Sequence, residues 1–464
     1  MNRTLSSTKI LIFLTFMFTL LGFLCTLGAG YIRFWEIEAK EILSLFFYLI
    51  ILFSILIDRS KVSLFIPFIA VAFPTPLCHF SPGVFEQQGE NGIIYPFFNH
   101  VEFFFLFVLL IQEKLKIKIP KLVSFLCYGI LISFLFNLLF CRDFQEVGIL
   151  TTGLYTVRML ILISLFINNV TINKREFIKG ICYSILFLFI ESLLCTILLK
   201  LPTLTSGSLG SNTFGNICGQ LTSMLLFVVL FNKRLDYNKI VVYFVIATGL
   251  FIVIASETRM ALLSIILVFS LILYPRFKPS NKILLLVILC IVLYLSWNTI
   301  ADLLESSGKY DFAAIFDLLK EGRNVPRTST TSSLLTRIEL WSTSSNMIKE
   351  NPMTGIGFNM FDNLKDEFGF DVDVVIDPHN GYLYLLSALG LISGITFIYF
   401  LYIRPWIVYY KCTSSEIKSF CIFNMGMSIC EFTNAGVFKY QIFAMLVFLT
   451  LYSYKECFNR LQIE

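Results

Sequence analysis

The sequence predicts an all-α polytopic membrane protein, a bundle of about 12–14 transmembrane helices with one large, partly helical external loop. The composition is one reason: 57% of the 464 residues are hydrophobic and 14% are charged, whereas soluble chains carry roughly 25% charged residues. A second reason is that apolar runs of about 20 residues, long enough to span a bilayer, recur along the chain. Lipid offers the backbone no hydrogen bonds, so we expect these runs to be helices.

Fourteen apolar runs are candidates for these helices. The first run is too long for the core of a signal peptide, so we expect it to remain in the protein as a helix. The twelve cysteines are scattered singly, and we expect them to be small apolar fillers of helix interfaces. The runs lie at 9–29, 41–57, 62–79, 98–111, 121–140, 148–170, 176–199, 214–231, 239–255, 260–274, 282–300, 379–403, 417–433 and 438–454.

Lysine and arginine determine the predicted orientation. With the N-terminus inside, alternate connections hold 22 of these residues and the opposite short connections hold six. Cytoplasmic loops carry such an excess, so both termini are predicted to be cytoplasmic. The net charge of +5 includes no basic run with interleaved aromatic residues, and no nucleic-acid partner is expected. The six outer residues are Arg33, Lys40, Arg142, Lys200, Arg259 and Lys439.

One connection is long. Residues 301–378 are predicted to form an external segment between the eleventh and twelfth helices. Within it, Tyr310 to Leu319 places its apolar residues on one helical face, which could lie on the membrane surface. Long loops with helices of their own are usually functional.

The second half of this loop has clear start and stop signals. The polar run 327–333 is expected to be a flexible linker whose end caps a helix from about Leu334 to Lys349. Asn351-Pro352 is expected to end that helix, and Gly355-Ile356-Gly357 requires a turn.

Three residues at the predicted outer end of the bundle are candidate catalytic residues. Arg259, in S-E-T-R-M-A-L-L, begins the tenth helix; Arg337, in T-R-I-E-L-W, lies one turn before Trp341; and His379, in D-P-H-N-G-Y, enters the twelfth helix. Arginine presents a planar fork that suits phosphate oxygens, and an imidazole can take up a proton near neutral pH. Together they suit a reaction with a phosphate leaving group. Taken singly, each has an equally good structural explanation. Arg259 fits an interfacial anchor that snorkels to the headgroups, Arg337 fits a solvated loop charge, and His379 fits a helix cap.

Arg158 differs because it lies inside the sixth apolar run, where a charge is by default a functional-site hypothesis. We expect it to bind phosphate or glycan from within a cavity. Alternatively it lies near one end of its helix and reaches the headgroups. Glu191 is the other main intramembrane candidate.

Weaker signals include two acidic clusters and one glycine-rich segment. Asp371, Asp373 and Asp377 resemble a D-x-D metal site, and Glu36 with Glu38 is similarly ambiguous. Acidic loops in water are the commoner explanation, so no metal site is expected.

The segment 205–216 contains S-G-S-L-G-S-N-T-F-G-N, whose amides could meet an anion at the start of a helix. Asn212 and Gly215 are therefore candidate substrate-binding residues. The segment is not a P-loop, because no G-K-[ST] follows.

Several motifs in order resemble the O-antigen polymerase and ligase family. They are T-R-I-E-L-W…N-P-M-T-G-I-G-F-N-M-F at 336–361, D-P-H-N-G-Y-L-Y-L-L-S-A-L-G-L-I-S-G at 377–394, a Ser-x-x-Arg motif in S-E-T-R-M-A-L-L, and G-S-N-T-F-G-N-I-C-G. The resemblance covers roughly residues 205–400. With it, the chain divides into an N-terminal helix bundle (1–200), helices with the glycine-rich and Ser-x-x-Arg motifs (201–300), the external loop (301–378) and the C-terminal helices (379–464).

The resemblance implies a metal-independent glycosyltransferase without a cofactor, in the inner membrane of a bacterium and with the large loop in the periplasm. Its donor would be a glycan on undecaprenyl diphosphate and its acceptor a second glycan, with a chain-length regulator protein as a further candidate partner. Arg259 and Arg337 would bind the donor diphosphate. His379 would orient or deprotonate the acceptor hydroxyl, with Asn380 in support and Trp341 contacting substrate.

The leading hypothesis is an O-antigen polymerase, which transfers a growing lipid-linked chain onto a new lipid-linked repeat unit. The alternatives with the same chemistry are ligation of finished O-antigen to lipid A core and transfer of the glycan to a protein. A transporter or flippase is a hypothesis of another class. It would require ionisable residues on several helices or paired repeats with broken helices, and no repeat is visible in the sequence.

Overall fold

The computed structural model describes residues 33–34, 37–72, 100–112, 114–140, 147–199, 204, 211–231, 238–273, 329–358, 360–370, 378–433 and 440–461. The predicted helices at 9–29 and 282–300 and the amphipathic segment 310–319 lie outside these residues. Every predicted apolar run within them contains a helix. A two-stranded antiparallel pair precedes the first of these helices.

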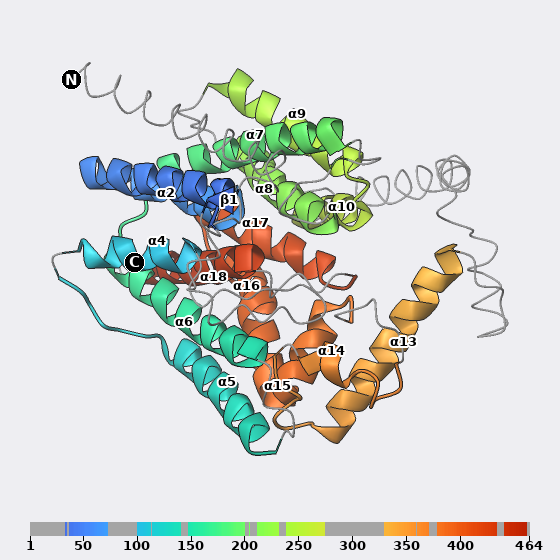
Figure 1. Ribbon diagram of the computed structural model, residues 1–464. Coiled ribbons are helices and arrows are strands. Elements are labelled where there is room, and N and C mark those ends of the chain that lie inside the picture. The colour runs from blue at the N-terminus through green and yellow to red at the C-terminus, as the bar shows by residue number, and fades with distance from the viewer. Residues whose placement is uncertain are drawn as a thin grey trace.

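Figure 1 shows the helices packed into a bundle. In this view α13 lies at the right and the C-terminus lies at the left. The elements are β1 (Arg33–Phe34), β2 (Ile37–Glu38), α2 (Ala39–Ile57), η1 (Arg59–Lys61), α3 (Val62–Pro67), η2 (Phe68–Ala72), α4 (His100–Leu110), α5 (Lys121–Phe140), α6 (Val147–Asn169), α7 (Lys174–Leu199), α8 (Ser211–Phe231), α9 (Lys239–Ala255), α10 (Arg259–Leu273), α13 (Ser329–Glu350), α14 (Met360–Leu364), α15 (Gly381–Ile398), η6 (Tyr399–Ile403), α16 (Arg404–Lys411), α17 (Ser415–Cys430) and α18 (Tyr440–Leu461).

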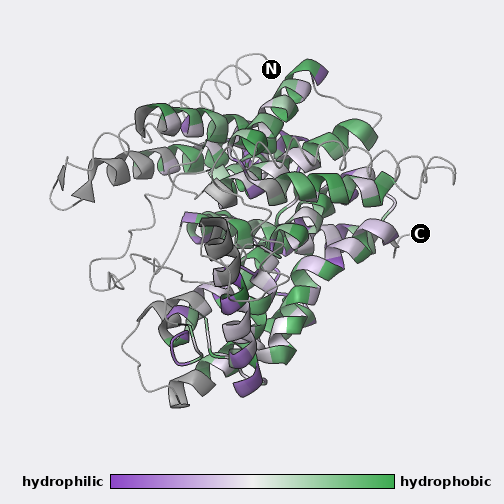
Figure 2. Cartoon of the chain, turned by 90° about the vertical axis from the view of Figure 1, so that its right-hand side faces the viewer, coloured by the Kyte–Doolittle hydropathy of each residue, from purple (hydrophilic) through white to green (hydrophobic). Residues whose placement is uncertain are grey.

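The bundle exposes large apolar side chains and buries polar ones, which is typical of a protein that faces lipid. On α9, Ile240 is 78% exposed and Phe244 is 62% exposed. In the interior, the buried Asn424 side chain donates hydrogen bonds to the carbonyls of Leu401 and Leu446, each at 3.0 Å between nitrogen and oxygen. Hydrophobic residues dominate the helices in Figure 2.

Three helical segments are long and apolar enough to cross a membrane, by length and composition, among the described residues. They are Lys174–Leu194, Thr213–Phe231 and Gly381–Lys411. Shorter apolar helices accompany them, among them Lys239–Ala255 and Met260–Leu273. The apolar exterior and these segments together indicate a polytopic membrane fold.

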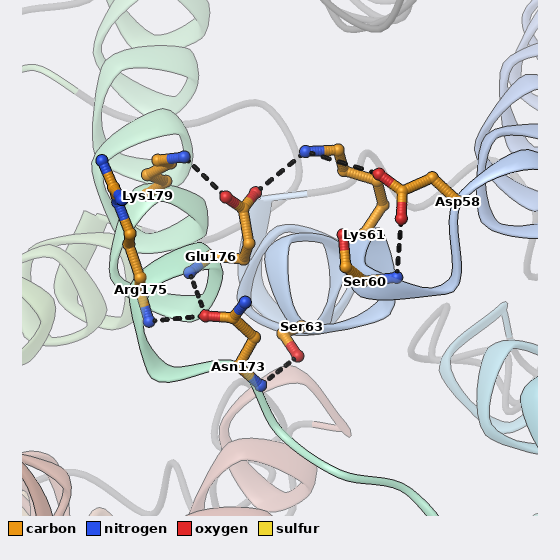
Figure 3. A network of polar contacts seen from close by, with 8 residues as sticks. All are labelled: Asp58, Ser60, Lys61, Ser63, Asn173, Arg175, Glu176 and Lys179. Atoms are coloured by element: carbon orange, nitrogen blue, oxygen red, sulfur yellow. Dashed lines mark hydrogen bonds and ion pairs between the residues drawn. The ribbon is translucent and has the colours of Figure 1, made fainter. Parts of the chain in front are cut away.

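Among the described residues, the connections around Lys61, Lys118 and Lys174, which the sequence assigns to the inner side, lie together at one end of the bundle. Figure 3 shows Lys61, after α2, and Lys179, on α7, both directed at the buried Glu176. The Lys61 Nζ lies 3.1 Å from a Glu176 carboxylate oxygen. The Asn168 amide donates to the Lys118 carbonyl at 2.6 Å, which brings the connection before α5 to the same end.

The C-terminal helices reach this end as well. Lys174 pairs with Glu416 at the start of α17, with 2.9 Å between nitrogen and oxygen. Lys455 near the end of α18 donates to the carbonyl of Ile167 at 2.6 Å. These connections are separated by up to several hundred residues in the sequence, so their convergence agrees with the predicted alternation of helix direction.

The twelfth predicted helix differs from the expectation of a continuous span over 379–403. Gly390 interrupts α15 with φ 73° and ψ 174°, and Tyr399–Ile403 is a π-helical turn. The helix then continues as α16 to Lys411. Such a break frees backbone groups of α15, and in a membrane these must be satisfied by other parts of the protein.

Residues of the predicted external loop satisfy the freed groups. The nitrogen of Ile356 donates to the Ser387 carbonyl at 2.8 Å, and that of Gly357 donates to the Ala388 carbonyl at 2.9 Å. The nitrogen of Leu391 in turn donates to the Pro352 carbonyl at 2.7 Å. The turn after α13 is therefore inserted into the break of α15.

The loop helix α13 begins earlier than the sequence indicates. It starts at Ser329, inside the polar run 327–333 that was expected to be a linker, and ends at Glu350 before Asn351-Pro352 as predicted. Serine and threonine have only modestly lower helix propensity than better formers, so tertiary context can extend a helix through them. The predicted turn is confirmed, with φ of 66° at Gly355 and 95° at Gly357.

Candidate functional site

A small hydrophobic core attaches α13 to the start of α15. Leu340 and Met347, two helical turns apart on α13, are both fully buried. They pack with Phe361 of α14 and with Tyr384 of α15. This core, together with the inserted turn at 352–357, positions α13 over the entrance to α15.

The turn before α15 holds His379 in a left-handed backbone conformation with φ of 48°. Non-glycine residues persist there only when surrounding contacts over-determine the backbone. The indole nitrogen of Trp341 on α13 donates to the Pro378 carbonyl at 3.1 Å. The nitrogen of Gly381 donates to the carbonyl of Glu431, after α17, at 2.8 Å. The half-buried His379 side chain thus extends from a turn that two other helices hold.

Asn380 is the N-cap of α15. Its Oδ1 accepts hydrogen bonds from the nitrogens of Tyr382 and Leu383 at 3.0 and 3.1 Å, and its Nδ2 donates to the Phe432 carbonyl at 3.2 Å. Asparagine is among the preferred N-cap residues. Capping accounts for the buried side chain, and the predicted support of substrate binding stays a prediction.

Arg259 is the first residue of α10, and its side chain lies outside what the structure describes. The turn before it contains Glu257 with φ 54°, which with His379 makes up the non-glycine residues of positive φ in the described part. Residues with strained backbone cluster at functional sites. The positive φ of both Glu257 and His379 therefore favours one site that includes both turns. The hydroxyls of Ser256 and Thr258 in this turn are 2.9 Å apart.

The start of α10 lies beside the end of α17. The thiol of Cys430 donates to the Met260 carbonyl, with 3.7 Å between sulfur and oxygen. The next residue, Glu431, accepts the hydrogen bond from the turn that carries His379. The backbone at Arg259 is therefore linked through α17 to that turn.

Arg337 lies on α13, the helix whose Trp341 contacts the turn that carries His379. It lies four residues before Trp341, which places the two on one face of α13 about 6 Å apart along the helix axis. The Arg337 side chain is half-buried. Neither a hydrogen bond nor an ion pair of its guanidinium occurs within the described part of the chain, so its charge is available to an anion. The hydrogen bond from Trp341 to the Pro378 carbonyl thus links the helix that carries Arg337 to the turn that carries His379, and the backbone at Arg259 is linked to that turn through α17.

The glycine-rich entry to α8 also borders this end. Gly215 is buried against the Ser256–Thr258 turn, and a Cβ there would overlap Thr258. Packing therefore explains why position 215 is glycine. The side chain of Asn212 lies outside the described residues. Substrate contact by either residue stays a prediction.

Arg158, half-buried on α6, forms an ion pair with a buried carboxylate. Its Nε lies 2.9 Å from Glu102 Oε1 and its Nη2 lies 3.2 Å from Oε2, a bidentate arrangement between α6 and α4. The Glu102 side chain is fully buried. Glu102 provides the Arg158 guanidinium with an anionic partner, and phosphate or glycan binding by Arg158 stays a prediction.

Replacing Arg158 by glutamine is expected to destabilise the protein by about 3–5 kcal/mol, because it removes the ionic partner of a buried carboxylate. The double variant Glu102→Gln/Arg158→Gln should recover most of this loss. Thermal unfolding of the purified protein in detergent measures the loss of stability in the single variant and its recovery in the double variant. A double variant that is stable but inactive would instead support ligand binding by Arg158.

Glu431 is a residue of this site that sequence reasoning overlooked. It is 1% exposed and follows α17, inside the apolar run 417–433. An acidic residue in such a run is a signal for function or for a specific partner. Glu191, which was considered, is also 1% exposed but lies on α7.

Of the acidic clusters Asp371–Asp377 and Glu36–Glu38, the residues Asp371, Asp373, Asp377 and Glu36 lie outside the described part of the chain. Within the described part, no group of three or more His, Cys, Asp or Glu side chains could hold a metal ion.

The comparisons with known proteins bear on the same region. Residues 242–398 match the family model described as O-antigen ligase. The matched segment runs from α9 to the end of α15, so it contains Arg259, Arg337 and His379 together with the inserted turn. The comparison with curated proteins gives no match.

Proposed function

We propose that this chain, whose residues 242–398 match the family model described as O-antigen ligase, is a surface-polysaccharide polymerase of the bacterial inner membrane. It would transfer a glycan from undecaprenyl diphosphate onto a lipid-linked repeat unit. The observation that carries the proposal is the hydrogen bond from Trp341, one turn after Arg337 on α13, to the carbonyl of Pro378, the residue before His379.

The chemistry divides between these groups. The His379 imidazole takes the proton of the acceptor hydroxyl, whose oxygen then forms a bond to the anomeric carbon of the donor glycan. The bond from that carbon to the diphosphate oxygen breaks, and its electron pair leaves with the diphosphate. A positioned base typically contributes about 10²–10⁴-fold in rate.

Arg337 and Arg259 would stabilise the negative charge that develops on the departing diphosphate. Arginine suits this role because its planar fork binds phosphate oxygens bidentately. The two guanidinium groups supply the positive charge that a divalent metal supplies in other transferases. We therefore infer a metal-independent reaction without a cofactor, whose rate does not fall on addition of EDTA.

The membrane orientation follows from the same proposal. Both termini and the lysine-bearing connections around Glu176 would face the cytoplasm, and α13 with the site would face the periplasm. A lipid-carried donor could then reach Arg337 and His379 from the outer leaflet. A chain-length regulator protein remains a candidate partner at that face.

Ligation of finished O-antigen to lipid A core is the second candidate function, favoured by the description of the matched family. Both reactions need the same leaving group and the same base. They differ in the acceptor glycan.

A deletion strain distinguishes the two functions, and its lipopolysaccharide is read on a gel. Loss of a polymerase is expected to leave single repeat units attached to lipid A core. Bare core with lipid-linked polymer accumulating would instead identify a ligase. Unchanged long-chain polysaccharide would contradict both, and complementation with the intact gene serves as the control.

A further inference from the structure

The Trp341 side chain joins the helix that carries Arg337 to the backbone turn that carries His379. Trp341 lies one turn after Arg337 on α13, and its indole nitrogen donates to the Pro378 carbonyl at 3.1 Å. The next residue is His379, whose φ of 48° is a conformation that side-chain-bearing residues rarely adopt. The contact therefore acts on the peptide group immediately before the strained residue.

The surroundings make this contact rigid. The buried Leu340, adjacent to Trp341, anchors this part of α13 in the core shared with Tyr384 of α15. At its C-terminal end, α13 is tied to α15 by the hydrogen bond between Leu391 nitrogen and the Pro352 carbonyl at 2.7 Å. Since α13 is held on both sides of Trp341, the indole nitrogen has a fixed position relative to α15.

We propose that Trp341 is a positioning residue. Its hydrogen bond to the Pro378 carbonyl keeps His379 at a fixed position relative to Arg337. The inference rests on the proposed function and assigns Trp341 a different role from the substrate contact expected from the sequence. In this role the N–H group matters. A sugar-binding role would instead depend on the aromatic face, which phenylalanine also provides.

The test compares Trp341→Phe with the intact protein, both reconstituted in vesicles with lipid-linked repeat units extracted from the deletion strain. Trp341→Phe is expected to lower the polymerisation rate about tenfold to a hundredfold, because small displacements of a reacting group have effects of that size. A wild-type rate for a folded Trp341→Phe protein would overturn the proposal.

A double-mutant cycle separates positioning from general destabilisation. If Trp341 acts through His379, Trp341→Phe is expected to add no further loss in a His379→Ala background. An equal loss in both backgrounds would contradict the proposal. If His379→Ala were itself fully active, the proposed function would fail, which is a different outcome from failure of the Trp341 role alone.

Two further variants complete the design. Ser344→Ala is the matched control, because Ser344 is buried on the same helix and its hydroxyl donates within the helix to the Leu340 carbonyl at 2.9 Å. It should leave the rate unchanged. If Trp341→Phe does not yield folded protein, Trp341→His, which keeps a ring N–H, is expected to restore folding and activity. A folded but inactive histidine variant would count against the proposal.

Discussion

Replacing His379 by alanine is expected to remove long-chain surface polysaccharide from cells in which the variant is the sole copy. If the imidazole is the general base, its loss lowers the rate of glycan transfer by about 10²–10⁴-fold. The left-handed turn and the contacts from Trp341 and Glu431 do not involve the imidazole, so the variant should still fold. Gel analysis of the polysaccharide and immunoblotting of the membrane fraction measure both quantities.

Arg337→Ala is the companion change, with an expected loss of about 10²–10³-fold from weaker stabilisation of the leaving diphosphate. Matched controls are His79→Ala and Arg142→Ala, which change the same residue types on the predicted outer side but outside the recognised motifs. These controls should retain long-chain product. Unaltered product in both His379→Ala and Arg337→Ala would remove the basis of the catalytic assignment.

Replacing Gly390 by alanine is expected to prevent the turn after α13 from inserting into α15. The backbone at Gly390, with φ 73° and ψ 174°, is one that only glycine adopts readily, at a cost of about 1–3 kcal/mol for other residues. A Cβ at this position would also lie 2.5 Å from the Met353 carbonyl group, which cannot move without displacing the turn. We expect little folded protein, measured as the monodisperse fraction in size-exclusion chromatography after detergent extraction.

Gly369→Ala is the control for this prediction. Gly369 also has positive φ, at 94°, but a Cβ there would meet no atom within 4 Å. The Gly369→Ala variant should therefore be destabilised only by the backbone strain at its positive φ. We expect it to yield folded, active protein. Gly355→Ala, whose Cβ would lie 2.5 Å from the Ala388 carbonyl group, should behave like Gly390→Ala. If Gly390→Ala yielded as much folded protein as Gly369→Ala, the close approach would not be essential to the fold.

Much of the fold could be predicted because lipid imposes a simple rule on the sequence. A run such as 121–140 must satisfy its backbone internally, so length and polarity alone predict α5 (Lys121–Phe140). The same rule did not reveal the break at Gly390. There the hydrogen bonds come from Pro352, Ile356 and Gly357, which lie more than thirty residues earlier in the chain.

The candidate site divides in the same way. The residue types, an arginine suited to diphosphate and a histidine suited to proton transfer, were apparent at Arg259, Arg337 and His379 from the sequence and its family resemblance. The link between the helix of Arg337 and the turn of His379 was not apparent, because it depends on the hydrogen bond from Trp341 to the Pro378 carbonyl. Glu431 was overlooked for the related reason that its contact with Gly381 joins segments fifty residues apart.

A helical membrane protein with candidate catalytic residues toward one end can be predicted from the sequence alone, because hydrophobicity and residue type are local properties. The contacts between distant segments depend on the tertiary structure. It paired Arg158 with Glu102, inserted the turn at 352–357 into α15, and linked Trp341 to the turn that carries His379. Each of these depends on a hydrogen bond or a close approach between distant segments, and periodicity along the chain carries no information about such contacts.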